Sequence, residues 1–336
     1  MPYPHPAPQG IGPLAQQAMH VLYQHRLVST RQLHQLLTPH HTRAEYLRRQ
    51  LHTLRNADLA NAVGRRTSGQ TELLWWLTDK GAQAVEAVGL LPQRPYRMSP
   101  EAALGPLQEH TLAGTDAGLA FVTHARRLGH ECSPLDWAPE IAHYYRDDAR
   151  PGEELCLVPD AILNYVHTDQ KQRTRTLLTF FIEVDRTQMT IARLAAKLHA
   201  YAAYEQYIPQ LPARSPRAAR RTATTQAWRS RYPAFPRLLL VLTGASPSRL
   251  ARRIADLRSL AASDPDLATA TLRAGATTLD QLTEHGPFAP VFTPILGPAT
   301  PTDAWLRPAP ATDQHSAACP SNPPTTTPPT PPRRPP

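Results

Sequence analysis

The sequence predicts an α+β or α/β protein with two folded domains and a disordered tail. Apolar residues at helical spacing dominate the first ninety residues, and short apolar strand candidates alternate with helical segments from residue 106 to residue 307. From residue 308 to residue 336 the chain carries eleven prolines and five threonines without apolar periodicity, so this segment cannot bury enough surface to fold. With 336 residues, of which 41% are hydrophobic, the chain can form one large core or two domains.

Residues 11–90 are expected to form the first domain, after a proline-rich and disordered opening over residues 1–10. An apolar stripe at helical spacing indicates its first helix: Leu14, Ala18, Val21 and Leu22. Ser29 can cap a second helix, because Gln32 stands at the reciprocal position of a capping box. Both helices then bury one apolar face in a common core.

A third helix is expected from Thr42, with a polar face turned outward and three leucines turned inward: Leu47, Leu51 and Leu54. Two short strands around the turn TSGQ follow it, and Thr78 can cap a last helix that ends near Val88. Three helices followed by a basic hairpin resemble winged helix-turn-helix domains. In those domains the third helix enters the major groove of DNA and the hairpin forms the wing.

Positive charge is concentrated in this segment. From Leu14 to Gln70, eight arginines stand against two acids, so the segment carries +6 of the formal charge of +9. We therefore expect double-stranded DNA as a partner, with base edges read from the third helix and phosphates contacted by both helix and wing. The expected readers are Arg49, His52 and Asn56, and the full expected set is Arg43, Arg48, Arg49, His52, Arg55, Asn56, Arg65 and Arg66. The alternatives are a winged helix that contacts protein and an arginine face that only meets solvent.

A proline-rich linker is expected at 91–105, followed by a second domain at 106–307. Its expected elements are a helix at 106–128, strands at 131–141, 157–166 and 176–185, a helix at 190–207, a strand at 237–243 and a helix at 247–260. This order predicts a mixed sheet covered by helices. Residues 211–237 lack acids and periodicity, so we expect a basic insertion loop that follows DNA phosphates, with Trp228 free to stack on bases, or a loop that only meets solvent.

The stretch FFIEVDRTQM, residues 180–189, places two acids in the most apolar run of the chain. Because side chains alternate along a strand, Phe181, Glu183 and Asp185 would share one face, and the intervening apolar residues the other. Burying two carboxylates on one face is costly unless a cation meets them. A positive group is therefore expected close to this strand.

Pro159 and Asp160 form a PD dipeptide on the preceding strand candidate, 23 residues before Glu183. This arrangement resembles the PD-(D/E)xK, or restriction-endonuclease-like, nuclease fold. The resemblance implies that Asp160 and Glu183 are metal ligands, that Mg²⁺ is the cofactor, and that a lysine positions or activates the attacking water. Asp185 occupies the position of that lysine, where it could add a third oxygen ligand or accept a proton. Lys197, on the next helix, could supply the missing cation and complete the expected catalytic set of Asp160, Glu183, Asp185 and Lys197.

Other roles for these residues are open. Glu183 and Asp185 could instead form a network of ion pairs with Arg186, Arg193 or Lys197. Gln188 is a second substitute for the motif lysine. Further acids that could join the site are Glu109, Asp116 and Glu140.

Several segments together resemble the replication-relaxation family of bacterial plasmids and integrative elements. They are LVSTRQLHQLL at 27–37, LTDKG at 77–81, EHTLAG at 109–114, WAPE at 137–140, PDAIL at 159–163, FFIEVDRTQM at 180–189 and AAKLHAYAAYEQY at 195–207. The resemblance spans residues 12–307 and implies a DNA-binding protein of mobile-element replication or mobilisation, with a Mg²⁺-dependent DNA nickase as one form. The alternative is a non-catalytic replication or transcription regulator with a degenerate nuclease fold. Relaxase or replication proteins are the implied protein partners.

Composition excludes several other classes. The three cysteines are too few and too scattered for a zinc site or a disulfide framework, and no GxxxxGK[ST] motif for nucleoside triphosphates occurs. The longest apolar run, LLLVL at 238–242, is far shorter than the roughly 18 residues of a membrane span, and the opening residues do not resemble a signal peptide. We therefore expect a cytoplasmic protein without membrane contact. The oligomeric state and the DNA target do not follow from the sequence.

Overall fold

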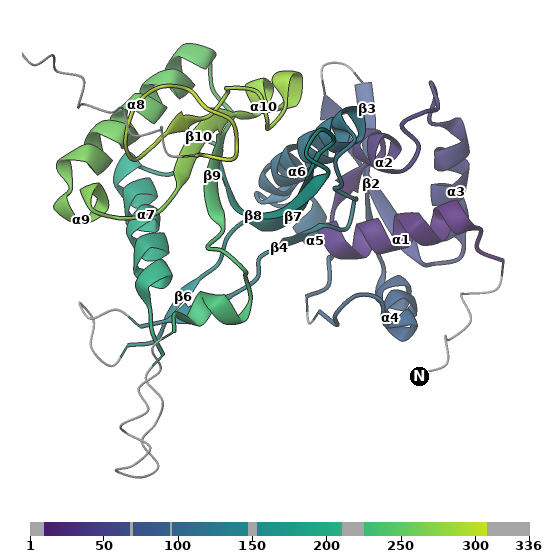
Figure 1. Cartoon of the computed structure of the whole chain (residues 1–336). Coiled ribbons are helices and arrows are strands. Elements are labelled where there is room, and N and C mark those ends of the chain that lie inside the picture. The colour runs from purple at the N-terminus through teal and green to yellow at the C-terminus, as the bar shows by residue number, and fades with distance from the viewer. Residues whose placement is uncertain (1–9, 68–69, 95, 147–152, 210–224, 308–336) are drawn as a thin grey trace, which may run out of the picture. The chain divides into compact units, whose positions relative to one another are not determined.

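Local capping chemistry starts and ends the first helices of the computed structural model, which describes residues 10–67, 70–94, 96–146, 153–209 and 225–307 (Figure 1). The hydroxyl of Ser29 accepts a hydrogen bond from the Gln32 N–H, and the Gln32 side chain accepts one from the Ser29 N–H, which confirms the expected capping box. Thr78 caps its helix as expected. The elements up to residue 88 are α1 (Pro13–His25), β1 (Val28–Ser29), α2 (Thr30–Leu37), α3 (Glu45–Asn56), β2 (Ala60–Thr67), β3 (Gln70–Leu77) and α4 (Asp79–Val88).

The third helix is shorter than the sequence suggested. It begins at Glu45 rather than Thr42, and its N-cap residue Ala44 offers no side chain to cap it. Its three leucines are buried as expected, and they share one core with α1, α2 and Trp75 of β3. The strands form a small sheet in the order β1-β3-β2, in which Val28 lies opposite Trp75. This sheet fixes the hairpin beside α2 and α3.

The segment expected as a linker, residues 91–105, makes specific contacts with α1. The backbone N–H of Arg94 donates to the Tyr23 hydroxyl at 3.0 Å, and its guanidinium donates to the Gln24 carbonyl at 2.6 Å. The short helix α5 (Pro100–Ala103) lies within this segment, capped by Ser99. These residues are therefore attached to the helical segment before them.

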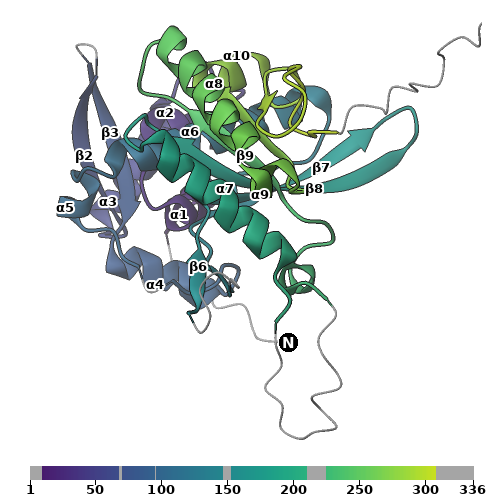
Figure 2. The same cartoon turned by 90° about the vertical axis from the view of Figure 1, so that its left-hand side faces the viewer.

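A six-stranded mixed sheet forms the second part of the fold, as expected. Its order is β11-β10-β9-β8-β7-β4, with β8, β9 and β10 parallel and the other pairs antiparallel. Figure 2 shows the β7–β8 hairpin extending past the neighbouring strands. The remaining elements are α6 (Gln108–Leu128), β4 (Trp137–Pro139), β5 (His143–Tyr145), β6 (Leu155–Leu157), β7 (Ala161–Asp169), β8 (Thr174–Asp185), α7 (Ile191–Gln206), η1 (Ala227–Ser230), β9 (Arg237–Leu242), α8 (Pro247–Ser263), α9 (Pro265–Ala268), β10 (Ala274–Thr278), α10 (Leu279–His285) and β11 (Thr293–Pro294).

Helices cover both faces of this sheet (Figure 1). On one face Phe180, Ile182 and Val184 pack with α6, and on the other Phe181 packs with α7 and α8. The expected alternation along β8 is thereby confirmed. Because α7 covers the face that carries Glu183 and Asp185, both acids are buried beneath a helix.

Three expectations about local structure were wrong. Residues 131–141 do not form one strand, since β4 covers only Trp137–Pro139 of this segment. Residues 157–166 do not form one strand, since β6 ends at Leu157 and β7 begins at Ala161, with Asp160 in a bend between them. Pro159 explains the break, because proline cannot donate to a strand ladder. Trp228 is not free to stack on bases: it is only 5% exposed, its indole N–H donates to the Glu205 carbonyl, and Arg229 covers its ring at 4.3 Å.

Some expectations fall on residues that the structure does not describe. The disorder expected at 1–10 and 308–336 and the basic loop expected at 211–237 fall wholly or partly on residues 1–9, 308–336 and 210–224, which lie outside the described residues. Within the described part of the chain, no helix has both the length and the apolar character needed to cross a membrane.

Candidate active site and nucleic-acid interface

Asp160 lies in the bend before β7, where neighbouring elements hold both of its carboxylate oxygens. Oδ2 accepts a hydrogen bond from the Val184 N–H of β8 at 2.7 Å, and Oδ1 lies 3.3 Å from Nε2 of His110 on α6. Burial alone would raise the pKa of Asp160, but the hydrogen bond and charge of His110 lower it below its ordinary value. The same hydrogen bond raises the pKa of His110. Both shifts favour a carboxylate on Asp160 beside a protonated imidazole on His110.

Glu183 projects from β8 toward α7, and its side chain is only 1% exposed. Oε2 lies 2.5 Å from Nζ of Lys197, and Oε1 accepts a hydrogen bond from the Tyr201 hydroxyl at 2.6 Å. Burial, followed by the negative charge of Asp160, nevertheless raises the pKa of Glu183 to about 7. Two carboxylates that interact unfavourably thus belong to one site, in which Glu183 is buried and Asp160 is partly exposed.

Lys197 and Tyr201 stand one turn apart on α7 and reach the same carboxylate. Burial lowers the pKa of Lys197, but the charges of Glu183 and Asp160 outweigh it, so the pKa is raised and the ammonium stays protonated. The expected cation beside the apolar strand is therefore present. Glu205, one more turn along α7, forms a hydrogen bond with Thr271. A catalytic role for Lys197 stays a prediction.

Asp185, at the end of β8, is paired with a cation from another helix. Its Oδ2 accepts a hydrogen bond from Nε of Arg253 on α8, and its Oδ1 accepts one from the Thr187 N–H at 3.1 Å. Arg253 also donates to the Met189 carbonyl. Asp185 thus forms an ion pair, with Arg253 rather than with Arg186, Arg193 or Lys197. Its role as a metal ligand or catalytic group stays a prediction.

Asp160 and Glu183 have the donor type that Mg²⁺ prefers. Two carboxylates that repel each other gain from a divalent cation between them, and water or phosphate oxygens could supply the remaining ligands. Among the described residues, the one group of three His, Cys, Asp or Glu side chains with all donor atoms within 4.8 Å is His199, Asp264 and Asp266, which lies elsewhere. The protein would therefore contribute two ligands from Asp160 and Glu183, with no third donor already gathered around them.

A small cavity of about 50 Å³ gives access to Asp160 and His110. Glu140 lines it as well, and its backbone N–H is 3.4 Å from the Asp160 carbonyl oxygen. Its carboxylate, however, lies 2.5 Å from the Arg26 guanidinium of α1. Glu140 has a φ of 52°, a conformation that costs free energy in a residue other than glycine and recurs at functional sites.

The expected DNA-contacting residues are largely accessible. Arg43, before α3, Arg66 on the hairpin and the five expected residues of α3 are exposed, and Arg65 is half-buried. The ring of His52 meets the edge of Trp75 at 5.6 Å, and the guanidinium of Arg49 lies over Tyr46 at 5.6 Å. The α3 residues are Arg48, Arg49, His52, Arg55 and Asn56.

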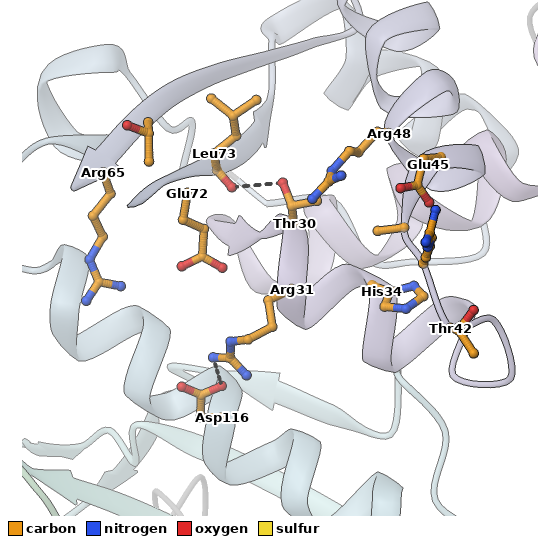
Figure 3. A pocket seen from close by; sticks show the side chains of 13 residues that line it. Thr30, Arg31, His34, Thr42, Glu45, Arg48, Arg65, Glu72, Leu73 and Asp116 are labelled. Carbon is orange, nitrogen blue, oxygen red and sulfur yellow. Dashed lines mark hydrogen bonds and ion pairs between the residues drawn. The ribbon is translucent and has the colours of Figure 1, made fainter. Parts of the chain in front are cut away.

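A cleft of about 910 Å³ opens between α2, the start of α3, the β2–β3 hairpin and α6 (Figure 3). Of the expected residues, Arg43, Arg48 and Arg65 line it, and Arg31 and His34 of α2 join them. The other expected residues lie outside this cleft: Arg49, His52, Arg55, Asn56 and Arg66. Helix and hairpin therefore contribute cations to one concave surface.

Two arginines of this cleft are paired with acids of α6. Arg31 lies 2.8 Å from Asp116, a contact drawn in Figure 3, and Arg65 lies 2.9 Å from Glu109. Two of the three further acids that the sequence suggested for the metal site, Glu109 and Asp116, thus pair with arginines of the cleft instead. Such partly exposed ion pairs contribute only about 0–1 kcal/mol each. An incoming phosphate could replace either carboxylate at little cost.

Sequence reasoning did not assign site roles to His110, Tyr201, Arg253 and Arg31. Tyr201 lies four residues after Lys197, so the two share a helical face, and this spacing could have predicted that both reach the same group. His110 lies 50 residues before Asp160 and Arg253 lies 68 residues after Asp185, so no local spacing links them to these acids. Their place follows only from the packing of α6 and α8 on opposite faces of the sheet.

Comparison with known proteins bears on residues 19–215. No curated protein and no solved structure matched the chain. The sequence profile of the replication-relaxation family matches residues 19–215, more than half of the chain, and this range includes Asp160, Glu183 and Lys197. The chain belongs to the replication-relaxation family.

Proposed function

We propose that this protein binds double-stranded DNA of a plasmid or integrative element through a winged helix formed by α1 to α4. Support comes from the order of its elements, from the exposed arginines of α3 and from the cleft that joins α3 to the hairpin. Arg43, Arg48 and Arg65 would contact phosphates, and Arg49, His52 and Asn56 would face the bases. Replication or mobilisation of the element is the process that the family name suggests.

We further propose that the acid pair of Asp160 and Glu183 is the reaction centre of a Mg²⁺-dependent DNA nickase related to PD-(D/E)xK nucleases. The observation that carries this proposal is the 2.5 Å contact between the Lys197 ammonium and Glu183 beside Asp160. The motif lysine of those nucleases would stand at the position of Asp185. Lys197 would supply the same positive charge from α7. Mg²⁺, when bound, would polarise the phosphoryl group and lower the pKa of bound water.

The protein's own residues would have separate roles in that site. Asp160 and Glu183 would hold the metal, His110 would keep Asp160 ionised and oriented, and Tyr201 would orient Glu183. Lys197 remains an ammonium, so it would stabilise negative charge on the phosphate rather than act as a base.

Supercoiled plasmid incubated with Mg²⁺ or Mn²⁺ provides the test. The wild type is expected to convert it to the open circular form, and Asp160→Asn and Glu183→Gln, which keep the shape of each side chain, are expected to abolish conversion. Asp169→Asn, at the far end of β7, is the matched control and should nick normally. Nicking that survives both substitutions, or that never appears in the wild type, rules out the catalytic proposal.

A second candidate function is a non-catalytic replication or transcription regulator. One observation favours it: both oxygens of Glu183 already have donors within the chain, and Asp185 is paired with Arg253. In that case the acid site would only stabilise the fold. Specific binding of duplex DNA without any nicking, unchanged in Asp160→Asn, is the result that would identify this function.

A further inference from the structure

A second polar pocket, distinct from the acid site, lies where β9 and β10 begin and α7 ends. Its volume is about 370 Å³, within the usual range for small-molecule sites. Trp228, Phe235 and neighbouring prolines form its apolar wall, and Arg229, Arg237 and Arg273 supply positive charge. Of the described residues that line it, Glu205 is the only acid. A ligand of this pocket must therefore carry negative charge and apolar surface together.

The arginines of the pocket differ in how firmly they are held. Nε of Arg237 donates to the Trp305 carbonyl at 2.7 Å, so this buried guanidinium has a fixed place at the start of β9. Arg229 and Arg273 are exposed, and Arg229 covers the Trp228 ring at 4.3 Å. Two arginines can thus reach an anionic group at the mouth of the pocket.

Glu205 requires a hydrogen-bond donor from the ligand, which a simple anion does not provide. Its carboxylate hydrogen-bonds with Thr271 and is attracted by the charge of Arg273, but its Oε2 is buried and has no hydrogen-bond partner among the described residues. A buried acceptor without a donor is unfavourable, so the complementary ligand brings an N–H or O–H group to this oxygen. Burial also raises the pKa of Glu205, which agrees with an incompletely satisfied carboxylate.

We propose that this pocket binds one unpaired nucleotide, with its phosphate at Arg229 and Arg273 and an N–H of its base at Glu205. Each of the four bases carries an N–H donor on its Watson–Crick edge, and in a duplex that edge is covered by the partner base. The pocket therefore takes a nucleotide from single-stranded DNA or a free nucleotide, and not one within a duplex. Most of its lining lies beyond residue 215, outside the range that matches the family.

The base contact is tested with a ten-residue oligothymidylate, because the N3–H is the only such donor of thymine. The full-length protein is titrated in a chelating buffer, and binding is read by fluorescence anisotropy against the same oligonucleotide built from N3-methylthymidine. The wild type is expected to bind oligothymidylate about tenfold more tightly than the methylated strand, the effect of one hydrogen bond to a charged group. Glu205→Gln is expected to reduce this preference to less than about threefold. A preference that is unchanged in Glu205→Gln overturns the proposal.

The phosphate contact is tested with Arg229→Ala/Arg273→Ala, which should weaken binding of both strands about tenfold. Arg252→Ala, an exposed arginine of α8 outside the pocket, is the matched control and should change binding less than about twofold. Displacement of the strand by free thymidine monophosphate identifies a free nucleotide as the ligand, and its failure to displace identifies the strand. Equal competition by a duplex or by polyglutamate shows a general anion site and overturns the proposal. Since no metal is present and α3 is intact, these outcomes are independent of nicking.

Discussion

Glu183 is a residue in which opposing electrostatic effects meet. Burial and the charge of Asp160 disfavour its ionised form, while Lys197 and Tyr201 donate to it. Removing one member of a buried ion pair costs more free energy than the intact pair contributes, because the remaining charge is then buried without a partner. Lys197 and Tyr201 therefore stabilise Glu183 in its position between β8 and α7. Arg253 does the same for Asp185 at the end of the strand.

His25 offers a pH-dependent test of packing at the residue scale. It is buried at the end of α1, stacks on Trp137 at 4.1 Å and contacts the Pro134 carbonyl, and burial lowers its pKa to about 3. Below pH 6.5 the unfolded state binds more protons than the folded state, so stability falls as the pH falls toward 3. Between pH 7 and pH 5 this one group should cost about 2 kcal/mol of unfolding free energy.

The measurement is urea unfolding of the wild type and of His25→Gln, which keeps a donor for the Pro134 carbonyl. The difference between the two proteins should shrink by about 2 kcal/mol from pH 7 to pH 5. Parallel pH profiles would contradict the assignment of a buried, neutral imidazole at this position.

At the scale of elements, α6 connects the helical segment with the sheet. One side contributes Asp116 and Glu109 to the arginines of the cleft, and another contributes His110 to Asp160. Its contact with Trp137 of β4 is close because Gly118 has no side chain: an added Cβ would lie 2.5 Å from the indole ring. The position of α6, and with it that of His110, depends on this contact.

Two glycines of α6 provide a matched prediction. Gly118→Ala is expected to destabilise the protein by about 1–3 kcal/mol, since Trp137 or the helix must move. Gly114→Ala, with no neighbour within 4 Å of the added Cβ, is expected to stabilise it by about 0.5–1 kcal/mol through higher helix propensity. Urea unfolding of both variants checks the pair. Equal changes in the free energy of unfolding would show that packing against Trp137 does not restrict the size of the residue at position 118.

At the scale of the whole molecule, electrostatic attraction is expected to dominate DNA binding. Each phosphate contact contributes about 0.9 to the slope of log affinity against log salt. Arg48→Ala/Arg49→Ala should therefore flatten the slope by about 0.9, through loss of the Arg48 phosphate contact, whereas Arg249→Ala/Arg252→Ala on α8 should leave it nearly unchanged. Duplex binding measured between 50 and 200 mM salt decides the matter, and a slope that stays steep without Arg48 and Arg49 would remove α3 from the interface.

Patterns of neighbouring residues predicted much of the fold. In the acid site they indicated the acids and Lys197, but not His110 and Arg253. Capping at Ser29 and Thr78, the leucines of α3 and the alternation along β8 all depend on neighbours in sequence, and each was confirmed. The elements after α8, from α9 to β11, were missed because they are short and lack periodicity. His110 and Arg253 could not be found because they reach Asp160 and Asp185 only through tertiary packing.

The central claim is that Asp160, Glu183 and Lys197 form the reaction centre, with Lys197 in place of the motif lysine. The most direct test is the initial rate of Mg²⁺-dependent nicking of supercoiled plasmid by Lys197→Met, compared with Lys171→Met in the exposed turn between β7 and β8. We predict that Lys197→Met lowers the rate about a hundredfold or more, as removal of a charge-stabilising donor does in other enzymes, and that Lys171→Met stays within about twofold of the wild type. Equal nicking by Lys197→Met and Lys171→Met would contradict this account.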